Sequence, residues 1–239
     1  MNQSLASADQ NDSIIRTQRV LGWILLVLSP IFAWVVVNAP TDAVQGMMQK
    51  ILYVHPPLAY GAYLGFVVTA IGGGLFLWRG EERYDQLAIA GAEVGTVFCS
   101  LMLITGPIWA RGAWGPGNWW VWDARLTLTL LLWFVYLAYL LLRSFTEGEE
   151  RTARFASIYG ILGVVLIPLN YWIIDLVGGR AQHPENIQSG SLGEGMGLPF
   201  LVGNLTLFFA FAYLLVLRWR VGVLRAESER VAYENEASA

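Results

Sequence analysis

The chain has 239 residues, of which 56% are hydrophobic and 14% are charged, and its mean hydropathy is +0.50. Because about a quarter of the residues in soluble domains are charged, this composition excludes an ordinary soluble domain and indicates a membrane protein. The single cysteine, Cys99, excludes a disulfide framework and a cysteine-rich metal site within one chain. We expect the lipid bilayer, and no nucleic acid, among its partners.

Six apolar segments are long enough to cross a bilayer as helices, which takes about 20 residues. They are residues 20–37, 56–78, 87–110, 126–142, 156–174 and about 198–217, and only the third contains a charge, Glu93. The sequence therefore predicts an all-α integral membrane protein with six transmembrane helices. Residues 1–19 form a polar cytoplasmic leader, residues 20–218 one membrane domain, and residues 219–239 a cytoplasmic tail that is expected to be polar and frayed from Ala226 to Ala239.

Lysine and arginine set the expected orientation, because short loops rich in them stay cytoplasmic. The side predicted to be cytoplasmic holds Arg16, Arg19, Arg79, Arg83, Arg143, Arg151, Arg154, Arg218, Arg220, Arg225 and Arg230, whereas the other side holds Lys50, Arg111, Arg125 and Arg180. Both termini are therefore expected in the cytoplasm, with three loops outside. A signal peptide is the rival interpretation of residues 20–37, but the polar leader before them favours a retained anchor.

Within the spans, Glu93 is an ionisable residue in lipid, and we expect it to reach water or to pair with Arg83. The pairs Gly61 with Gly65 and Gly91 with Gly95 favour close packing between helices.

The two histidines of the chain both fall in loops predicted to face outward, His55 in the first and His183 in the third. Each precedes a proline, which pushes the preceding residue out of the helical region. We therefore expect both imidazoles to project from extended segments at helix mouths, which suits an axial ligand of a metal. A solvated loop histidine is the ordinary alternative for either one alone.

The second outer loop, at about 107–125, contains five of the 11 tryptophans within 14 residues. An interfacial aromatic belt is the ordinary explanation, but belts are scattered over many helix ends. This loop instead concentrates aromatic surface around the turn Gly115-Pro116-Gly117, and such a surface can lie against a large planar apolar ligand.

A porphyrin fits that description. Haem iron accepts one or two axial ligands, so His55 and His183 could hold a haem that lies on the tryptophan loop. Arg111 and Arg125 could meet its propionates, while Asp123 could orient a tryptophan N–H or pair with Arg125. No C-x-x-C-H sequence occurs, so the haem is expected to be haem b, held without covalent attachment.

The tryptophan loop also resembles a known signature. Trp114-Gly115, followed by Trp119-Trp120-Val121-Trp122-Asp123-Ala124-Arg125-Leu126-Thr127, resembles the "WWD" motif of haem-handling proteins. Its ending is similar to that of the cytochrome c maturation protein C family (CcmC, haem exporter protein C), and the length, the six spans and both histidines match that family as well.

The resemblance implies a role in cytochrome c biogenesis at the bacterial inner membrane. Members present haem on the periplasmic face and load it onto the haem chaperone, cytochrome c maturation protein E, alongside an ATP-binding-cassette pair, proteins A and B, and a small membrane protein D. It implies that His55 and His183 are the axial ligands, and that the haem-facing motif comprises Trp114, Gly115, Trp119, Trp120, Trp122 and Asp123.

Two other functions remain open from the sequence. A b-type electron-transfer subunit also uses two histidines, although it usually places them inside facing helices. A haem permease is the second alternative, although the paired broken helices of many transporters are not evident. We find no separate general acid, base or nucleophile, so enzyme status is uncertain and activity beyond haem presentation is not expected.

Overall fold

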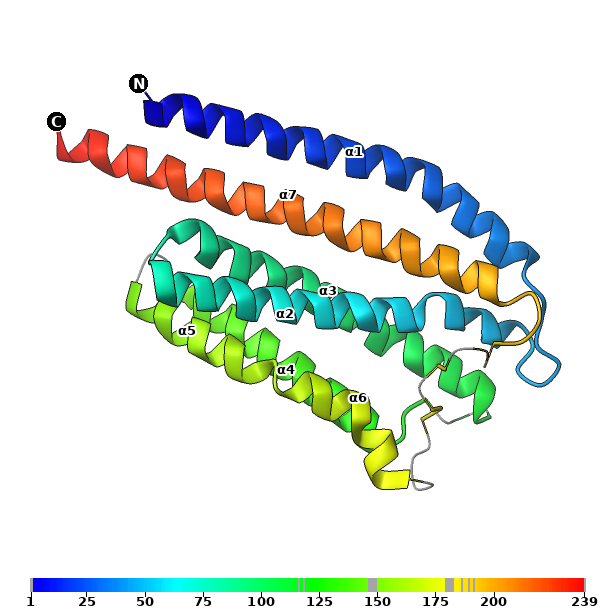
Figure 1. Ribbon diagram of the computed structural model, residues 1–239. Helices are drawn as coiled ribbons and strands as arrows, with labels where there is room; N and C mark the ends of the chain where they lie inside the picture. Colours follow the sequence, from blue (N-terminus) through cyan, green and yellow to red (C-terminus); the bar gives the residue numbers. More distant parts are fainter. Residues whose placement is uncertain are drawn as a thin grey trace.

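The computed structural model describes residues 2–115, 117, 119–145, 150–178, 183–185, 187–188, 190 and 192–238, with side chains from residue 13 onward. Helices make up most of this part of the chain (Figure 1). They are α1 (Asn2–Asn38), the 3-10 helix η1 (Met47–Tyr53), α2 (His55–Arg79), α3 (Glu82–Ala113), α4 (Ala124–Phe145), α5 (Glu150–Gly163), α6 (Leu166–Val177) and α7 (Gly197–Ala237).

Six helical segments of the described chain are long and apolar enough to cross a membrane. In two of them a pair of consecutive helices counts as one segment: η1 with α2, and α5 with α6. The prediction of an all-α protein with six membrane-spanning segments is confirmed.

Helices α2 and α3 pack along one another at the centre of the bundle. A Cβ atom built on Gly65 would lie 2.5 Å from the Cα of Gly95, and one built on Gly91 would lie 2.7 Å from the carbonyl oxygen of Gly65. Small residues of this kind let two backbones approach closely in lipid. Helix α4 joins the pair where the ring of Tyr136 stacks on that of Phe66, with centroids 3.7 Å apart.

Helix α1 lies at the edge of the bundle and packs on α7, and both chain termini lie at the same end (Figure 1). Its outer surface is apolar, since Trp23 and Trp34 are 68% and 67% exposed. Such a surface suits contact with lipid rather than water.

The fifth membrane segment, predicted as one helix, is broken into α5 and α6 at residues 164–165. Pro168 explains the break, because a proline lacks the N–H for the helical hydrogen bond and its ring clashes with the carbonyl four residues earlier. That carbonyl belongs to Val164, and it accepts instead from the N–H of Ile167, at 3.0 Å.

Two ion pairs fasten α3 to its neighbours away from the tryptophan loop. Asp85 pairs with Arg143 of α4, and Glu93 pairs with Arg218 of α7. The expected pairing of Glu93 with Arg83 is wrong, because ten residues of helix separate the two by about 15 Å along the axis.

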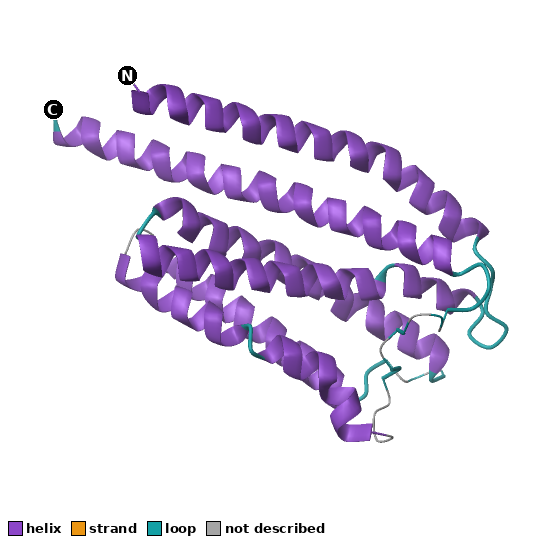
Figure 2. Cartoon of the chain, in the orientation of Figure 1, coloured by secondary structure: helices purple, strands orange, loops and turns teal. Residues whose placement is uncertain are grey.

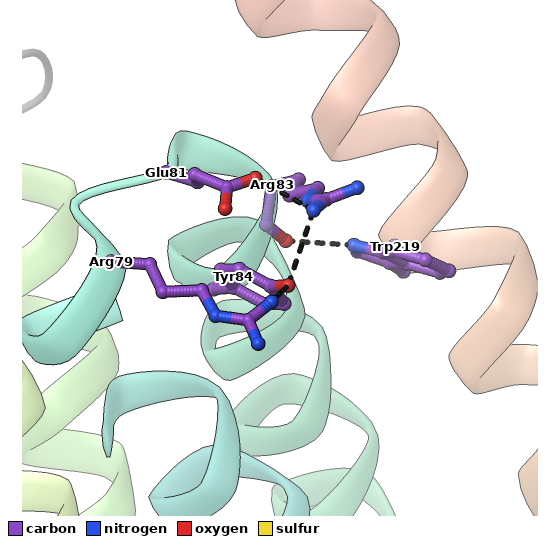
Figure 3. Close-up of polar contacts among 5 residues, drawn as sticks. All are labelled: Arg79, Glu81, Arg83, Tyr84 and Trp219. Carbon is purple, nitrogen blue, oxygen red and sulfur yellow. Dashed lines mark hydrogen bonds and ion pairs between the residues drawn. The ribbon is translucent and has the colours of Figure 1, made fainter. Parts of the chain in front are cut away.

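Arg83 instead lies at the turn between α2 and α3, shown in Figure 3. Its guanidinium pairs with Glu81 at 2.7 Å and donates to the hydroxyl of Tyr84 at 3.2 Å. Arg79 donates to the same hydroxyl at 2.6 Å, and Trp219 of α7 donates from Nε1 to the carbonyl of Arg83 at 2.9 Å. This cluster ties the turn to α7.

The polar tail also differs from expectation. The tail, predicted to be frayed, continues α7 as helix to Ala237, and the leader is helical from Asn2. The tail contains good helix formers such as alanine, glutamate and arginine. Arg230 and Glu234 lie one helical turn apart with their charged atoms at 3.9 Å.

Candidate functional site

The longer connections of the bundle gather at the end opposite the two termini (Figure 2). They join α1 to η1, α3 to α4, and α6 to α7. The tryptophan loop is shorter than the predicted range of about 107–125, because α3 continues to Ala113 and α4 begins at Ala124. Within the loop, Gly115 has a φ of +95°, a left-handed conformation that favours glycine.

His55 is the first residue of α2 and not part of an extended segment. Helical hydrogen bonding already begins at Val54, whose carbonyl accepts from the N–H of Leu58 at 3.0 Å. Pro56 and Pro57 then occupy the first turn, where a missing N–H costs no hydrogen bond. His55 still lies at a helix mouth, as predicted, but on a rigid element.

The imidazole of His55 is oriented by Thr105 of α3, whose hydroxyl oxygen lies 3.0 Å from Nδ1. That hydroxyl donates its own hydrogen to a backbone carbonyl, of Leu101 at 3.0 Å or of Met102 at 3.1 Å. When the hydroxyl donates in this way, its oxygen accepts from Nδ1–H of His55. This tautomer leaves Nε2 with a free lone pair, the form that binds metals.

His183 lies in the connection between α6 and α7, and two hydrogen bonds hold it. Its backbone N–H donates to Oδ2 of Asp123 at 3.4 Å, and its Nδ1 lies 2.8 Å from the carbonyl oxygen of Pro184. A carbonyl only accepts, so Nδ1 carries the hydrogen and Nε2 is again free. Burial lowers the pKa of His183, because the charged imidazole loses hydration. The neutral, ligating form is thereby favoured.

The two imidazole rings lie close together, with centroids 6.4 Å apart and planes inclined by 34°. A metal–imidazole bond is about 2 Å long, and each ring centre lies about 1 Å beyond its nitrogen. Two such bonds on opposite sides of one ion give about 6 Å between centroids. The separation of His55 and His183 therefore fits one metal ion between them.

Asp123, the last residue of the tryptophan loop, caps α4. Its Oδ1 accepts from the backbone N–H of Arg125 at 2.8 Å, and its carbonyl accepts from the N–H of Thr127 at 2.9 Å. An aspartate at this position satisfies N–H groups that a helix start leaves without partners. The same carboxylate holds the backbone of His183, so it links the second and third loops.

The predicted tryptophans separate into two groups. Trp114 and Trp120 line the cavity that contains both histidines, whereas Trp119 and Trp122 are 48% and 77% exposed and do not. Trp109, at the end of α3, also lines the cavity and donates from Nε1 to Gln45 at 2.9 Å.

The two arginines of the predicted site occupy different places. Arg111 is exposed, with its guanidinium 4.8 Å from the ring centre of Trp119, and it does not line the cavity. Arg125 does line the cavity, but its Nε and Nη2 donate to the backbone carbonyls of Asn170 and Tyr171 in α6. Its contact with Asp123 is through the backbone N–H described above.

A buried polar network that the sequence did not reveal lies beside Arg125. Asn170 is fully buried; its Oδ1 accepts from the hydroxyl of Tyr63 in α2 at 2.7 Å, and its Nδ2 donates to Thr129 of α4 at 3.0 Å. Asn170 thus joins three helices beneath the cavity. Its position two residues after Pro168 was the available signal, because a kink frees backbone groups that need polar partners.

The cavity has a volume of about 290 Å³, just below the about 300–1,000 Å³ typical of ligand sites. Apolar side chains such as Ile51, Leu52, Met102 and Leu103 form much of its wall. Two neutral imidazoles in an apolar, aromatic-lined cavity can bind a flat, apolar, metal-containing ligand. Pro116 and Asn118 of the tryptophan loop, and Arg180 and Gln182 before His183, lie outside the described residues.

Known proteins match this chain over most of its length. The sequence model of the heme exporter protein C family (CcmC) matches residues 3–234. The chain is 32% identical over 223 residues to "Heme exporter protein C" of Haemophilus influenzae, covering 85% of this chain and 87% of the relative. It is 31% identical over 239 residues to the protein of that name from Bradyrhizobium diazoefficiens, covering 93% and 89%. A ccmC-like mitochondrial protein of cytochrome c biosynthesis from Arabidopsis thaliana is 32% identical over 222 residues, covering 90% and 81%.

Proposed function

Because this chain belongs to the heme exporter protein C family, we propose that it is a haem-handling protein of cytochrome c biogenesis. It holds haem b between His55 and His183, against the tryptophan loop, and presents it to the haem chaperone, cytochrome c maturation protein E. The haem is cargo rather than a resident group.

The spacing of the two imidazoles is the observation that carries this proposal. Their centroids are 6.4 Å apart, and each Nδ1 is engaged so that each Nε2 is free. Bound haem supplies an iron with two axial positions, and a pair of neutral histidines is the donor set that fills them. The tryptophans and aliphatic residues of the cavity wall exclude water from the ring.

Haem is held without a covalent bond to cysteine, because the chain lacks the pair of cysteines that thioether attachment uses. Cys99 is the single cysteine of the chain and is buried in α3. Ligation and contacts therefore hold the haem, which keeps it transferable. The protein supplies position and ligands, while the reactivity belongs to the porphyrin and its iron.

Within this proposal the haem site faces the periplasm from the bacterial inner membrane. Support comes from the arginines, which concentrate at the end of the bundle that holds both termini, opposite the histidines. The ATP-binding-cassette pair, proteins A and B, and the small membrane protein D complete the proposed machinery.

The purified chain tests the ligand assignment directly. We expect it to bind haem with the spectrum of a six-coordinate iron with two histidine ligands, and we expect His55→Ala and His183→Ala each to remove one ligand and shift that spectrum. Thr105→Val should weaken haem binding by about 10- to 100-fold, the usual cost of losing a partner of a ligand, whereas Thr105→Ser keeps the hydroxyl and should bind normally. Unchanged spectra in both histidine variants would refute the assignment.

A measurement of haem delivery to the chaperone distinguishes the proposed function, haem presentation, from the alternative of electron transfer. Trp120→Ala and Asp123→Ala are expected to reduce transfer of haem to the chaperone, because the first removes cavity wall and the second releases His183. Full transfer with both variants would favour the electron-transfer alternative. Accumulation of haem inside vesicles that contain this chain alone would instead favour a permease.

A further inference from the structure

The cavity contains two buried polar groups that the ligation of iron does not use, on Gln49 and Trp120. We propose that these two side chains bind a carboxylate of the ligand, which for haem is a propionate. The inference rests on the proposed function and adds recognition of the polar edge of the porphyrin.

Gln49 faces the cavity because of the helix type that contains it. A 3-10 helix has three residues per turn, so side chains three apart lie above one another. The same interval of three separates Gln49 and Leu52 of η1 from each other and Leu52 from His55, two residues past the end of η1. All three line the cavity. The amide therefore lies on the same side of the chain as the histidine ligand.

The amide of Gln49 is only half satisfied. Its side chain is 95% buried, since its relative exposure is 5%. Nε2 donates to the hydroxyl of Tyr53 at 3.1 Å and contacts Sδ of Met196 at 3.6 Å. Among the described residues, Oε1 has no hydrogen-bond partner. A buried polar atom without a partner is costly, so this end of the amide needs a group from the ligand.

Rotating the amide by half a turn resolves the imbalance in favour of an anion. The carbonyl oxygen of Gln49 then accepts from the hydroxyl of Tyr53, which is itself fully buried. Nε2 with its two diverging N–H groups then takes the place that Oε1 occupied, and its weak contact with Sδ of Met196 is given up. The cavity gains two neutral donors where a carboxylate of the ligand can accept.

Trp120 supplies a further donor. Its Nε1 is buried and has no hydrogen-bond partner in the described part of the chain, although its ring lines the cavity and meets Trp122 edge-on. An indole N–H can only donate. It therefore calls for an acceptor, as the rotated amide of Gln49 does.

The arginines leave this role open. The guanidinium of Arg111 lies over Trp119 outside the cavity, and Arg125 already donates to two backbone carbonyls. Neutral donors also suit cargo that must leave, since a desolvated ion pair is slow to separate.

Haem and its dimethyl ester, whose two carboxylates are blocked, form a matched pair of probes. We expect Gln49→Leu in the full-length protein to weaken haem binding by about tenfold, the value of one hydrogen bond to a charged group, and to leave the affinity for the ester unchanged. Trp120→Phe keeps an aromatic ring but removes the N–H, and the same selective loss is expected.

Leu52→Ala is the matched control, because it trims the same face of η1 without touching a polar group; it should weaken both ligands alike. Equal losses for haem and ester in Gln49→Leu and Trp120→Phe would overturn the inference and assign both residues to packing. Equal affinities of all variants for haem would overturn it as well. A wild-type chain that binds neither porphyrin would overturn the proposed function and this inference with it, whereas binding of the ester alone would overturn only the inference.

Discussion

Each histidine of the site is fixed by an acceptor at Nδ1, but the two acceptors differ in rigidity. His55 at the start of α2 donates to Thr105 of α3, a second packed helix. His183 donates to the carbonyl of its own neighbour, Pro184. The first ligand is therefore oriented by tertiary structure, while the second is oriented by its own loop and by Asp123.

The lowered pKa of His183 gives a prediction for pH. A protonated imidazole has no lone pair for iron, so protons compete with haem only below the pKa of the free protein. Since burial lowers that pKa below its ordinary value of about 6.5, haem affinity should be constant from pH 8 to about 6.5 and fall in more acidic solution. Haem titrations at a series of pH values measure this dependence.

His183→Met is the control for this titration, because a thioether can bind iron and does not titrate. The haem affinity of this variant should fall less steeply in acidic solution than that of the wild type, because His55 is then the one histidine ligand that remains to be protonated. An affinity that already falls between pH 8 and pH 7 would contradict the assigned pKa shift.

Individual site residues were predictable from the sequence where their residue type is rare in the chain or clustered in one loop. The chain has two histidines, and both line one cavity; the clustered tryptophans drew attention to a loop whose Trp114 and Trp120 also line it. Thr105 and Gln49 were not predictable, because threonine and glutamine are common and only the packing of α3 and η1 brings them to the site.

At the scale of the helix, long uncharged runs were sufficient to predict the membrane segments, because lipid leaves few alternatives for a backbone. The boundaries were less predictable. Helix α3 extends past Pro107 to Ala113, and α7 continues far beyond its apolar part. Hydropathy reports contact with lipid, and a helix that leaves the bilayer loses this signal without losing its hydrogen bonds.

The contact between α2 and α3 depends on glycine at particular positions, which a pair of alanine substitutions tests. A Cβ at Gly65 would lie within 2.7 Å of three backbone atoms of α3, which cannot move without separating the helices. Gly65→Ala is expected to destabilise the protein by about 1–3 kcal/mol, the usual cost of overpacking. Unfolding in detergent micelles, followed by circular dichroism, measures the change.

Gly74 in the same helix provides the comparison, since a Cβ there would meet no atom within 4 Å. Gly74→Ala should be neutral or stabilising by up to about 1 kcal/mol, because alanine favours helix. Equal effects of the two substitutions would show that the helices tolerate separation at Gly65.

For the whole molecule, the ion pairs between helices and the histidine cavity lie in different regions of the bundle. The ion pairs of α3 with α4 and α7 and the cluster around Tyr84 are separate from the histidine cavity. Helix α3 belongs to both regions, because it supplies Asp85 near its beginning and Thr105 near its end. It is the element that joins the charged region to the site.

The ion pair of Asp85 with Arg143 allows a test of how strongly α3 is held to α4. Their side chains are 7% and 12% exposed, so Arg143→Met leaves a buried carboxylate without its partner. We expect a loss of about 3–5 kcal/mol in stability, and partial recovery in the double variant Asp85→Leu with Arg143→Met. Thermal unfolding in micelles measures both.

The exposed pair of Arg154 and Glu150, one helical turn apart in α5, is the control. Arg154→Met should change stability by less than about 1 kcal/mol, as is usual for surface pairs. A larger loss here than in Arg143→Met would show that burial does not determine the strength of these pairs.

The shared position of the termini has a practical consequence for handling the protein. Both ends of the chain emerge at the end of the bundle opposite the start of α2, where His55 lies, and opposite the connection between α6 and α7, which contains His183 (Figure 1). Beyond Gly222, which packs against Gln86 of α3, α7 continues as helix to Ala237 and adds about 20 Å at the C-terminal end. An affinity tag or a fluorescent label fused there stands clear of the cavity, and a chain immobilised by that tag offers its tryptophan loop to the solution.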